Sequence, residues 1–232
     1  MNLDRLRANL ESVRSRMADA SRRAGRDTSS TTLVAVTKKN PAEMIRALAG
    51  LGVDVLGENY PQELWEKVDG LADLDLRWHL IGHLQGNKAR KTLPLVRVVH
   101  GVDSLKLLRT IDGLAAELAD PPAVCLQVNA SGEASKHGWG PDALLGDAEA
   151  IASVRNVRIA GLMTMAGYGT TNEEARPAFV RLREARDRLR EATGLPLPDL
   201  SMGMSGDFEA AIEEGASMVR VGSALFEGVA GD

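Results

Sequence analysis

Short apolar runs and longer stretches with helical periodicity alternate along most of the chain. The apolar runs predict strands at residues 32–37, 53–56, 77–81, 96–100, 123–128, 157–163, 199–202 and 218–221. Apolar residues at intervals of three and four predict helices between them, at residues 41–51, 61–71, 87–93, 104–118, 141–153, 176–192 and 207–214. Successive strands start about 26 residues apart, which is the length of a strand followed by a crossover helix.

One further helical stripe precedes the first strand. It is formed by Leu3, Leu6, Leu10, Val13 and Met17, with arginines and acidic residues between them. A glycine and a polar run then interrupt the pattern. We expect residues 1–25 to form a leading helix that packs outside whatever follows.

Eight strand–helix units in 232 residues favour one architecture. Short, continuously apolar strands are typical of parallel strands covered on both faces, and eight such units fit a (β/α)8 TIM-type barrel. The predicted fold class is therefore α/β, with residues 1–232 forming a single domain. A doubly wound open sheet is the competing fold. No Gly-x-Gly-x-x-Gly motif follows the first strand, so its dinucleotide-binding version has no support.

Composition excludes several classes of function. The net charge of −4 argues against a nucleic-acid-binding surface. The single cysteine, Cys125, lies in an apolar run typical of a core, and the four histidines lack zinc-site spacing, so we expect neither a disulfide nor a metal. No apolar run is long enough to span a membrane, and acidic residues near the N-terminus argue against a targeting peptide. We expect a cytoplasmic protein without membrane or nucleic-acid partners.

Two lysines follow the first predicted strand directly. A barrel places its chemistry at the carboxyl ends of its strands, which is where Lys38 and Lys39 lie. A partly desolvated amine loses some of its preference for the charged form and can attack a carbonyl to make a Schiff base. The ordinary alternative is that both lysines only mark the exit of the strand into water. Asn40 and Pro41 then predict the cap and first position of the next helix.

Two turns after the last predicted strands have the composition of a phosphate site. Residues 201–207 read Ser-Met-Gly-Met-Ser-Gly-Asp, and residues 220–223 read Arg-Val-Gly-Ser. Small residues, a hydroxyl and backbone amides bind phosphate, and barrel enzymes often hold phosphate at these two loops. Asp207 would repel it, so we expect that carboxylate to cap its own helix. A phosphate at one end and an amine at the other fit a phosphorylated aldehyde such as pyridoxal 5′-phosphate (PLP).

Seven motifs in order give the chain a specific resemblance. They are Val-Thr-Lys at 36–38, Gly-Glu-Asn-Tyr at 57–60, Trp-His-Leu-Ile-Gly at 78–82, Leu-Gln-Gly-Asn-Lys at 84–88, Gly-Leu-Met at 161–163, Gly-Met-Ser-Gly-Asp at 203–207 and Val-Arg-Val-Gly-Ser at 219–223. Together they closely resemble the pyridoxal phosphate homeostasis protein family, which is similar in fold to the N-terminal barrel of alanine racemase. The resemblance covers residues 33–226, nearly the whole chain.

The resemblance implies which side chains hold PLP. Lys38 falls where the family places its Schiff-base lysine, and strand alternation lets only one of two neighbouring lysines face the site. The implied cofactor-binding set is Lys38, Asn59, His79, Met204, Ser205, Arg220, Gly222 and Ser223. Within it, Asn59 would lie beside the ring, and Ser205 with Gly222 and Ser223 would hold the phosphate.

Arg220 would approach the pyridine nitrogen. A permanent cation there opposes protonation of the ring nitrogen and weakens the ring as an electron sink, so strong carbanion chemistry is not expected. Simpler interpretations stay open: Asn59 as a turn residue, Arg220 paired with Glu58 or Asp207, and His79 as a hydrogen-bonded core histidine.

The implied function is vitamin B6 homeostasis, in which the protein holds PLP on Lys38 and stores or delivers it without turnover, with indirect effects on amino-acid and keto-acid balance. Apo forms of PLP-dependent enzymes are the expected recipients, and a monomer and a weak dimer are both compatible. The alternative is a PLP-dependent amino-acid racemase, but its expected second base is missing or improvised, since the chain ends at Asp232 and has only Tyr60 and Tyr168. A barrel acting on a phosphorylated sugar would lack partner acids. The loop 131–140, with Lys136 and His137, is a candidate lid.

Overall fold

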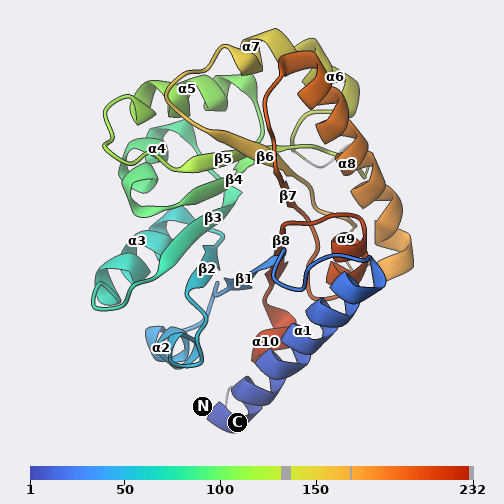
Figure 1. The fold of residues 1–232 in the computed structure, drawn as a ribbon. Coiled ribbons are helices and arrows are strands. Elements are labelled where there is room, and N and C mark those ends of the chain that lie inside the picture. Colours follow the sequence, from blue (N-terminus) through green and yellow to red (C-terminus); the bar gives the residue numbers. More distant parts are fainter. Residues whose placement is uncertain (132–136, 168, 230–232) are drawn as a thin grey trace.

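The computed structural model describes residues 1–131, 137–167 and 169–229. Within these residues eight parallel strands close into a barrel in sequence order, and the last strand pairs with the first (Figure 1). The strands are β1 (Thr32–Val36), β2 (Val55–Glu58), β3 (Arg77–His83), β4 (Val98–Val102), β5 (Ala123–Gln127), β6 (Ile159–Met163), β7 (Asp199–Ser201) and β8 (Met218–Val221). The predicted α/β barrel is confirmed, and the open doubly wound sheet is wrong.

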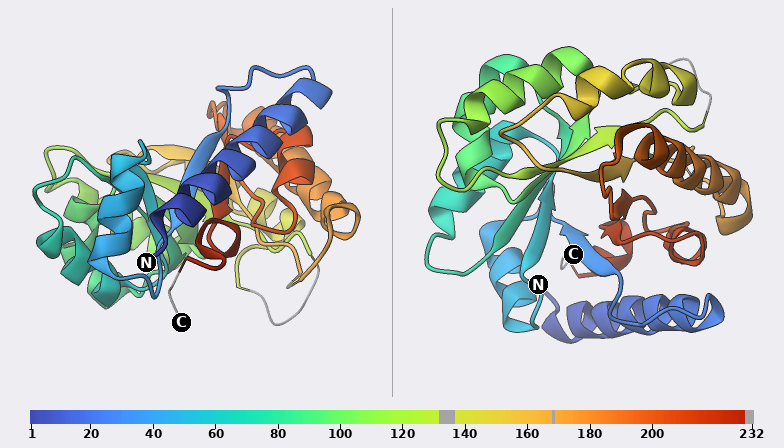
Figure 2. Two further views of the ribbon diagram at one scale, coloured as in Figure 1. Left: turned by 90° about the horizontal axis from the view of Figure 1, so that it is seen from below. Right: turned by 45° about the horizontal axis from the view of Figure 1, so that its top comes forward.

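Helices surround the barrel and follow the strands around it, as Figure 1 and the two views of Figure 2 show. They are α1 (Leu3–Arg23), α2 (Ala42–Gly50), α3 (Pro61–Gly70), α4 (Gly86–Thr92), a 3₁₀ turn (Leu93–Leu95), α5 (Leu105–Ala115), α6 (Pro141–Gly146), α7 (Ala148–Ala152), α8 (Asn172–Thr193), α9 (Phe208–Glu213) and α10 (Ser223–Phe226). The helix predicted at 141–153 is two helices, since the first ends at Gly146. None of the described helices combines the length and the apolar character needed to cross a lipid bilayer.

The leading helix α1 lies outside the barrel, as predicted. Its apolar stripe, which includes Leu6, Leu10 and Val13, is buried, and the helix packs against α9 and α10. The N–H of Asn2 donates to the carbonyl of Val229 over 2.9 Å, which holds the two ends of the described chain side by side (Figure 1).

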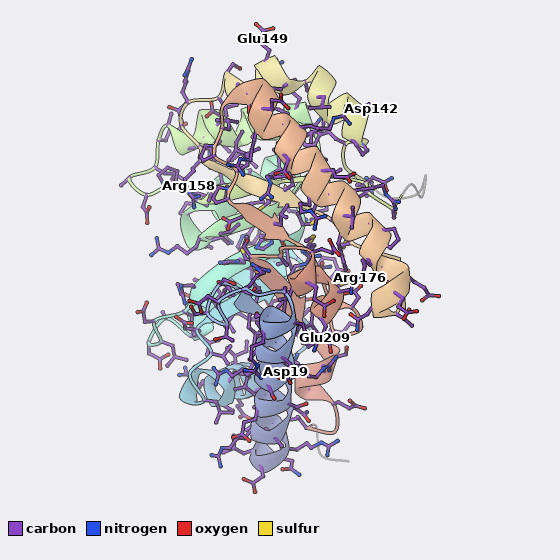
Figure 3. All side chains as sticks on the ribbon, turned by 45° about the vertical axis from the view of Figure 1, so that its right-hand side comes forward. Asp19, Asp142, Glu149, Arg158, Arg176 and Glu209 are labelled. Atoms are coloured by element: carbon purple, nitrogen blue, oxygen red, sulfur yellow. The ribbon has the colours of Figure 1, made fainter. Side chains whose placement is uncertain are left out.

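Ion pairs from both sides fix α9, the helix that follows the 201–207 segment. Arg16 of α1 pairs with Glu209 at 2.6 Å, and Arg176 of α8 pairs with Glu213 at 2.5 Å and with Glu214 at 2.8 Å. Figure 3 shows Glu209 beside α1 and Arg176 on α8 close to it. The segment before α9 therefore leads into a firmly placed helix.

The barrel interior is apolar in one part and polar in another. Val34 of β1 and Cys125 of β5 belong to one buried apolar cluster, which must lie inside the barrel because these strands are on opposite sides of it. Other inward positions carry buried polar groups instead, among them His79, His100 and Arg220. A barrel interior is usually filled with branched apolar side chains, so this polar part calls for an explanation.

Candidate functional site

Lys38 lies in the turn that leaves β1. The strand ends at Val36, one residue earlier than predicted, and Lys39 has a positive φ of 63°. The Lys38 side chain is exposed, and within the described part of the chain its amine has no hydrogen-bond or ion-pair partner. This corrects the expectation of a partly desolvated amine, because the turn carries the lysine into solvent at the barrel mouth.

Asn40 supports this turn and does not cap the next helix. The N-cap position of α2 is Pro41, without a side-chain cap, whereas the Nδ2 group of Asn40 donates to the carbonyl of Lys38 over 3.3 Å. The predicted cap is therefore wrong. The Asn40 side chain instead stabilises the turn that contains Lys38 and Lys39, by its hydrogen bond to the Lys38 carbonyl.

Strand register brings the predicted site residues to one edge of the barrel. Val36 pairs with Gly57, so Lys38 and Asn59 each lie two residues beyond a paired position on adjacent strands. Ala35 pairs with Val221 on the other side, so Gly222 leaves the barrel next to the same strand. These residues lie up to 184 positions apart along the chain (Lys38 to Gly222), and the closed barrel brings them to one edge.

A buried ion pair holds the residue before Lys38. Thr37 donates from its hydroxyl to Glu58 over 2.6 Å, and its backbone N–H donates to the carbonyl of Gly57 over 3.0 Å. The Lys67 ammonium donates to the Thr37 carbonyl over 2.8 Å and to Glu58 over 2.6 Å. Glu58 is fully buried, and its ion pair is with Lys67. The interpretation from sequence that Glu58 pairs with Arg220 is therefore wrong.

The predicted phosphate residues converge in the structure. The backbone N–H groups of Gly222 and Ala224 both donate to the Ser205 hydroxyl oxygen, each over 3.3 Å. An added Cβ at Gly222 would lie 3.2 Å from the Cβ of Val36, so a side chain there would press on β1. Ser205 is half-buried and Ser223 is exposed. Two backbone amides and the Ser205 hydroxyl thus meet between the loops after β7 and β8, and Ser223 lies between the two amides in sequence.

Asp207 turns away from this donor set, but it does so without capping α9. Its carboxylate accepts the backbone N–H of Met204 over 2.6 Å and the Thr170 hydroxyl over 3.4 Å, and it makes no side-chain cap on its own helix. Burial raises the pKa of Asp207, although the Met204 N–H and the nearby Arg220 charge oppose that shift. The aspartate therefore closes its own loop, and Met204 is held by its backbone.

Arg220 lies deep in the barrel wall, with an exposed fraction of 4%. It donates to the Ser201 hydroxyl over 2.5 Å and to the carbonyl of Thr164 over 2.8 Å. Burial lowers the pKa of Arg220 to about 10, so the guanidinium is still charged at neutral pH. No described residue makes a direct ion pair with it, and Asp207 acts on it only through its charge.

His79 is a hydrogen-bonded buried histidine. Its Nδ1 lies 2.9 Å from Nε2 of His100, whose Nδ1 lies 2.6 Å from the Ser201 hydroxyl. Burial lowers the pKa of His79 to about 4, and burial also puts the pKa of His100 well below its ordinary value. Both imidazoles are therefore neutral at pH 7.

Sequence reasoning missed His100, Ser201 and the pair Glu58–Lys67. His100 ended a predicted strand and Ser201 opened the 201–207 segment, but only the closed barrel shows that they face each other. Burial raises the pKa of Cys125 to about 12, which suits a core thiol. Lys136 and Tyr168 lie outside the described residues. In the described part of the chain, no three His, Cys, Asp or Glu side chains are placed to hold a metal ion.

The carboxyl edge of the closed barrel thus carries the accessible Lys38 amine, Asn59 after the adjacent strand, the backbone amides beside Ser205 and the buried Arg220. These are the features of a barrel that holds a phosphorylated carbonyl compound. The chain matches the family model described as "Alanine racemase, N-terminal domain" over residues 1–229. Alanine racemase of Clostridium difficile shares the fold with a TM-score of 0.77 at 18% identity, over 97% of this chain and 60% of that one.

Nearer relatives define the family more narrowly. The pyridoxal phosphate homeostasis protein of Pseudomonas aeruginosa is 44% identical over 218 residues, which cover 94% of this chain and 93% of that protein. PipY of Synechococcus elongatus, solved without PLP, is 38% identical with a TM-score of 0.86, over 95% of this chain and 99% of that one. A second structure of PipY has PLP bound. The chain belongs to the pyridoxal phosphate homeostasis protein family.

Proposed function

We propose that the chain binds PLP at the barrel mouth, attaches it covalently through Lys38, and stores or delivers it for vitamin B6 homeostasis. The single observation that supports this most is the convergence of the Gly222 and Ala224 amides on Ser205, in the loops after β7 and β8, where β8 pairs with the strand that precedes Lys38. Backbone amides grouped in this way can bind a phosphate, and they lie at the carboxyl end of the strands, where barrel proteins bind their ligands. The family membership points to the same cofactor, because PipY was solved with PLP bound.

Each residue would have a separate task. When bound, PLP supplies an aldehyde that condenses with an amine and a ring that withdraws electrons. Lys38 would form a C=N bond with the aldehyde carbon as the carbonyl oxygen leaves as water, and its exposed position makes the amine accessible to the aldehyde. Ser205, Gly222 and Ser223 would bind the phosphate, and Asn59 would contact the ring from the adjacent strand.

Arg220 would set the character of the site. A buried, fixed guanidinium near the pyridine nitrogen disfavours a second positive charge there, so the ring stays a weak electron sink. Holding a cofactor needs no strong electron sink, whereas rapid removal of a Cα proton does. This favours storage and delivery of PLP, with apo PLP-dependent enzymes as the recipients, over racemisation.

The test uses the purified chain and added PLP. Borohydride reduction should fix a pyridoxyl mass on the peptide that contains Lys38, and the mixture should show the absorbance of bound PLP. A protein that takes up no PLP, or carries the mass on another lysine, would overturn the assignment.

The racemase alternative has its own readout. The loaded protein is incubated with L-alanine and with other amino acids in deuterated water, and exchange of the Cα proton is followed by NMR. We expect inertness. Rapid exchange with loss of optical activity would favour a racemase.

A further inference from the structure

A chain of hydrogen bonds crosses the barrel interior and ends on Arg220. It runs from His79 on β3 to His100 on β4, then to Ser201 on β7 and Arg220 on β8. Its links measure 2.9, 2.6 and 2.5 Å, and all four side chains are buried. None of the sequence motifs predicted this connection.

The direction of the chain follows from what each group can donate. Arginine is a donor only, so the Ser201 oxygen accepts from Arg220. The Ser201 hydroxyl is fully buried, and its other described contact is Nδ1 of His100, so its own hydrogen must go there. If Nδ1 donated instead, the serine hydrogen would be left buried without an acceptor, which is costly.

The histidine tautomers follow in turn. Since Nδ1 of His100 accepts, the proton of that neutral ring is on Nε2, and it is donated to Nδ1 of His79. His79 then carries its own proton on Nε2. Arg77 near His79 and Arg220 near His100 both disfavour a positive charge on these rings. Of the four hydrogen-bonded side chains, only Arg220 is therefore charged.

We propose that His79, His100 and Ser201 are positioning residues for Arg220, joined to it by one directed chain of hydrogen bonds. Arg220 is held on one side by Ser201 and on the other by the Thr164 carbonyl, so its remaining donors have a fixed direction. His79 then acts on the cofactor through Arg220 and not by contact. The hydrogen bonds themselves do not depend on the proposed function; only the identification of PLP as the ligand near Arg220 rests on it.

The first test needs no PLP. Long-range ¹H–¹⁵N NMR spectra of the unloaded protein at pH 7 report the tautomer of each histidine ring, and the exposed His83 and His137 are assigned through H83N and H137N. We expect the Nε2–H tautomer at both His79 and His100. An Nδ1–H tautomer or a charged ring at His100 would overturn the directed chain, whether or not the protein binds PLP.

The second test separates positioning from packing. His79→Asn keeps an acceptor close to the place of Nδ1, whereas His79→Leu has similar size and no acceptor. We expect His79→Leu to weaken PLP binding about tenfold, the effect of one lost hydrogen bond, and to shift the absorbance of bound PLP, with His79→Asn close to wild type. Equal behaviour of the two variants would show that His79 only fills space.

Ser201→Ala removes the hydroxyl that joins His100 to Arg220. It should change the absorbance of bound PLP, because Arg220 loses its nearest acceptor. Ser217→Ala is the control, since the Ser217 hydroxyl bonds Asp199 and the Leu200 N–H and takes no part in the hydrogen bonds that lead to Arg220. An unchanged spectrum in Ser201→Ala, or the same change in Ser217→Ala, would contradict the proposal.

Discussion

The two cations of the candidate site come from neighbouring parts of the barrel, Lys38 from the turn after β1 and Arg220 from β8, but they lie in opposite environments. Lys38 is exposed on a turn after β1 and has no partner among the described residues, whereas Arg220 on β8 is buried and bound by Ser201 and the Thr164 carbonyl. An amine that must react with a carbonyl compound has to be accessible to that compound. A guanidinium that must only stay charged and in place benefits from burial and fixed partners. The barrel therefore keeps the amine proposed to react at its mouth and the guanidinium of the neighbouring strand in its interior.

The largest expected effect concerns the reactive side. Lys38→Ala should abolish covalent retention of PLP, because it removes the amine proposed to form the C=N bond. Borohydride reduction followed by peptide mass analysis measures the retained pyridoxyl group. Lys39→Ala is the control and should retain it; loss in Lys39→Ala with retention in Lys38→Ala would reverse the assignment of the two lysines.

Stability should show the opposite ranking of the two cations. Arg220→Met leaves the Thr164 carbonyl and the Ser201 hydroxyl without their donor, and we expect a loss of about 2–4 kcal/mol in the free energy of unfolding. Lys38→Met should stay within about 0.5 kcal/mol of wild type, because the side chain is exposed. Urea unfolding of the unloaded protein measures both. Arg158, which Figure 3 shows on the barrel exterior, provides an exposed arginine control through Arg158→Met. Equal losses in all three variants would contradict the comparison.

Acid should destabilise the protein through the buried histidines. The pKa of His79 is about 4 in the folded state and about 6.5 in the unfolded chain, so the unfolded chain takes up a proton first as the pH falls. The stability is fully present above about pH 6.5 and is lost as the pH falls towards 4, by about 2 kcal/mol between pH 7 and 5 from His79 alone. Urea unfolding at both pH values measures this. His79→Asn should reduce the difference, and an unchanged pH dependence would mean that His79 does not cause it.

The smallest expected effect concerns the phosphate residues. In Gly222→Ala the new Cβ would lie 3.2 Å from the Cβ of Val36, and we expect a loss of about 1 kcal/mol in stability together with weaker PLP binding. Thermal unfolding and PLP titration measure the two effects. Gly113→Ala in α5 is the matched control, since outside its own helix backbone nothing lies within 4 Å of the added Cβ. Tighter PLP binding in Gly222→Ala would contradict the role of this glycine.

Several parts of the molecule were predictable from local chemistry. The α1 stripe, the order of eight strands and helices, and the phosphate-like turns depend on periodicity and on residues near one another in the sequence. Element ends were less predictable: β1 stops at Val36, and Asn40 bonds the Lys38 carbonyl and leaves α2 uncapped. A cap and a turn compete for the same amide, and only the surrounding fold decides between them.

The sequence by itself determined the barrel and, through its motifs, the family and the lysine expected to react. The tertiary structure decided how exposed Lys38 is, that Glu58 pairs with Lys67, and that His79 reaches Arg220 through His100 and Ser201. The physical reason is the separation in sequence of the residues that interact. Periodicity and turns follow from neighbours in the chain, whereas burial and hydrogen-bond partners depend on which strands the closed barrel brings face to face.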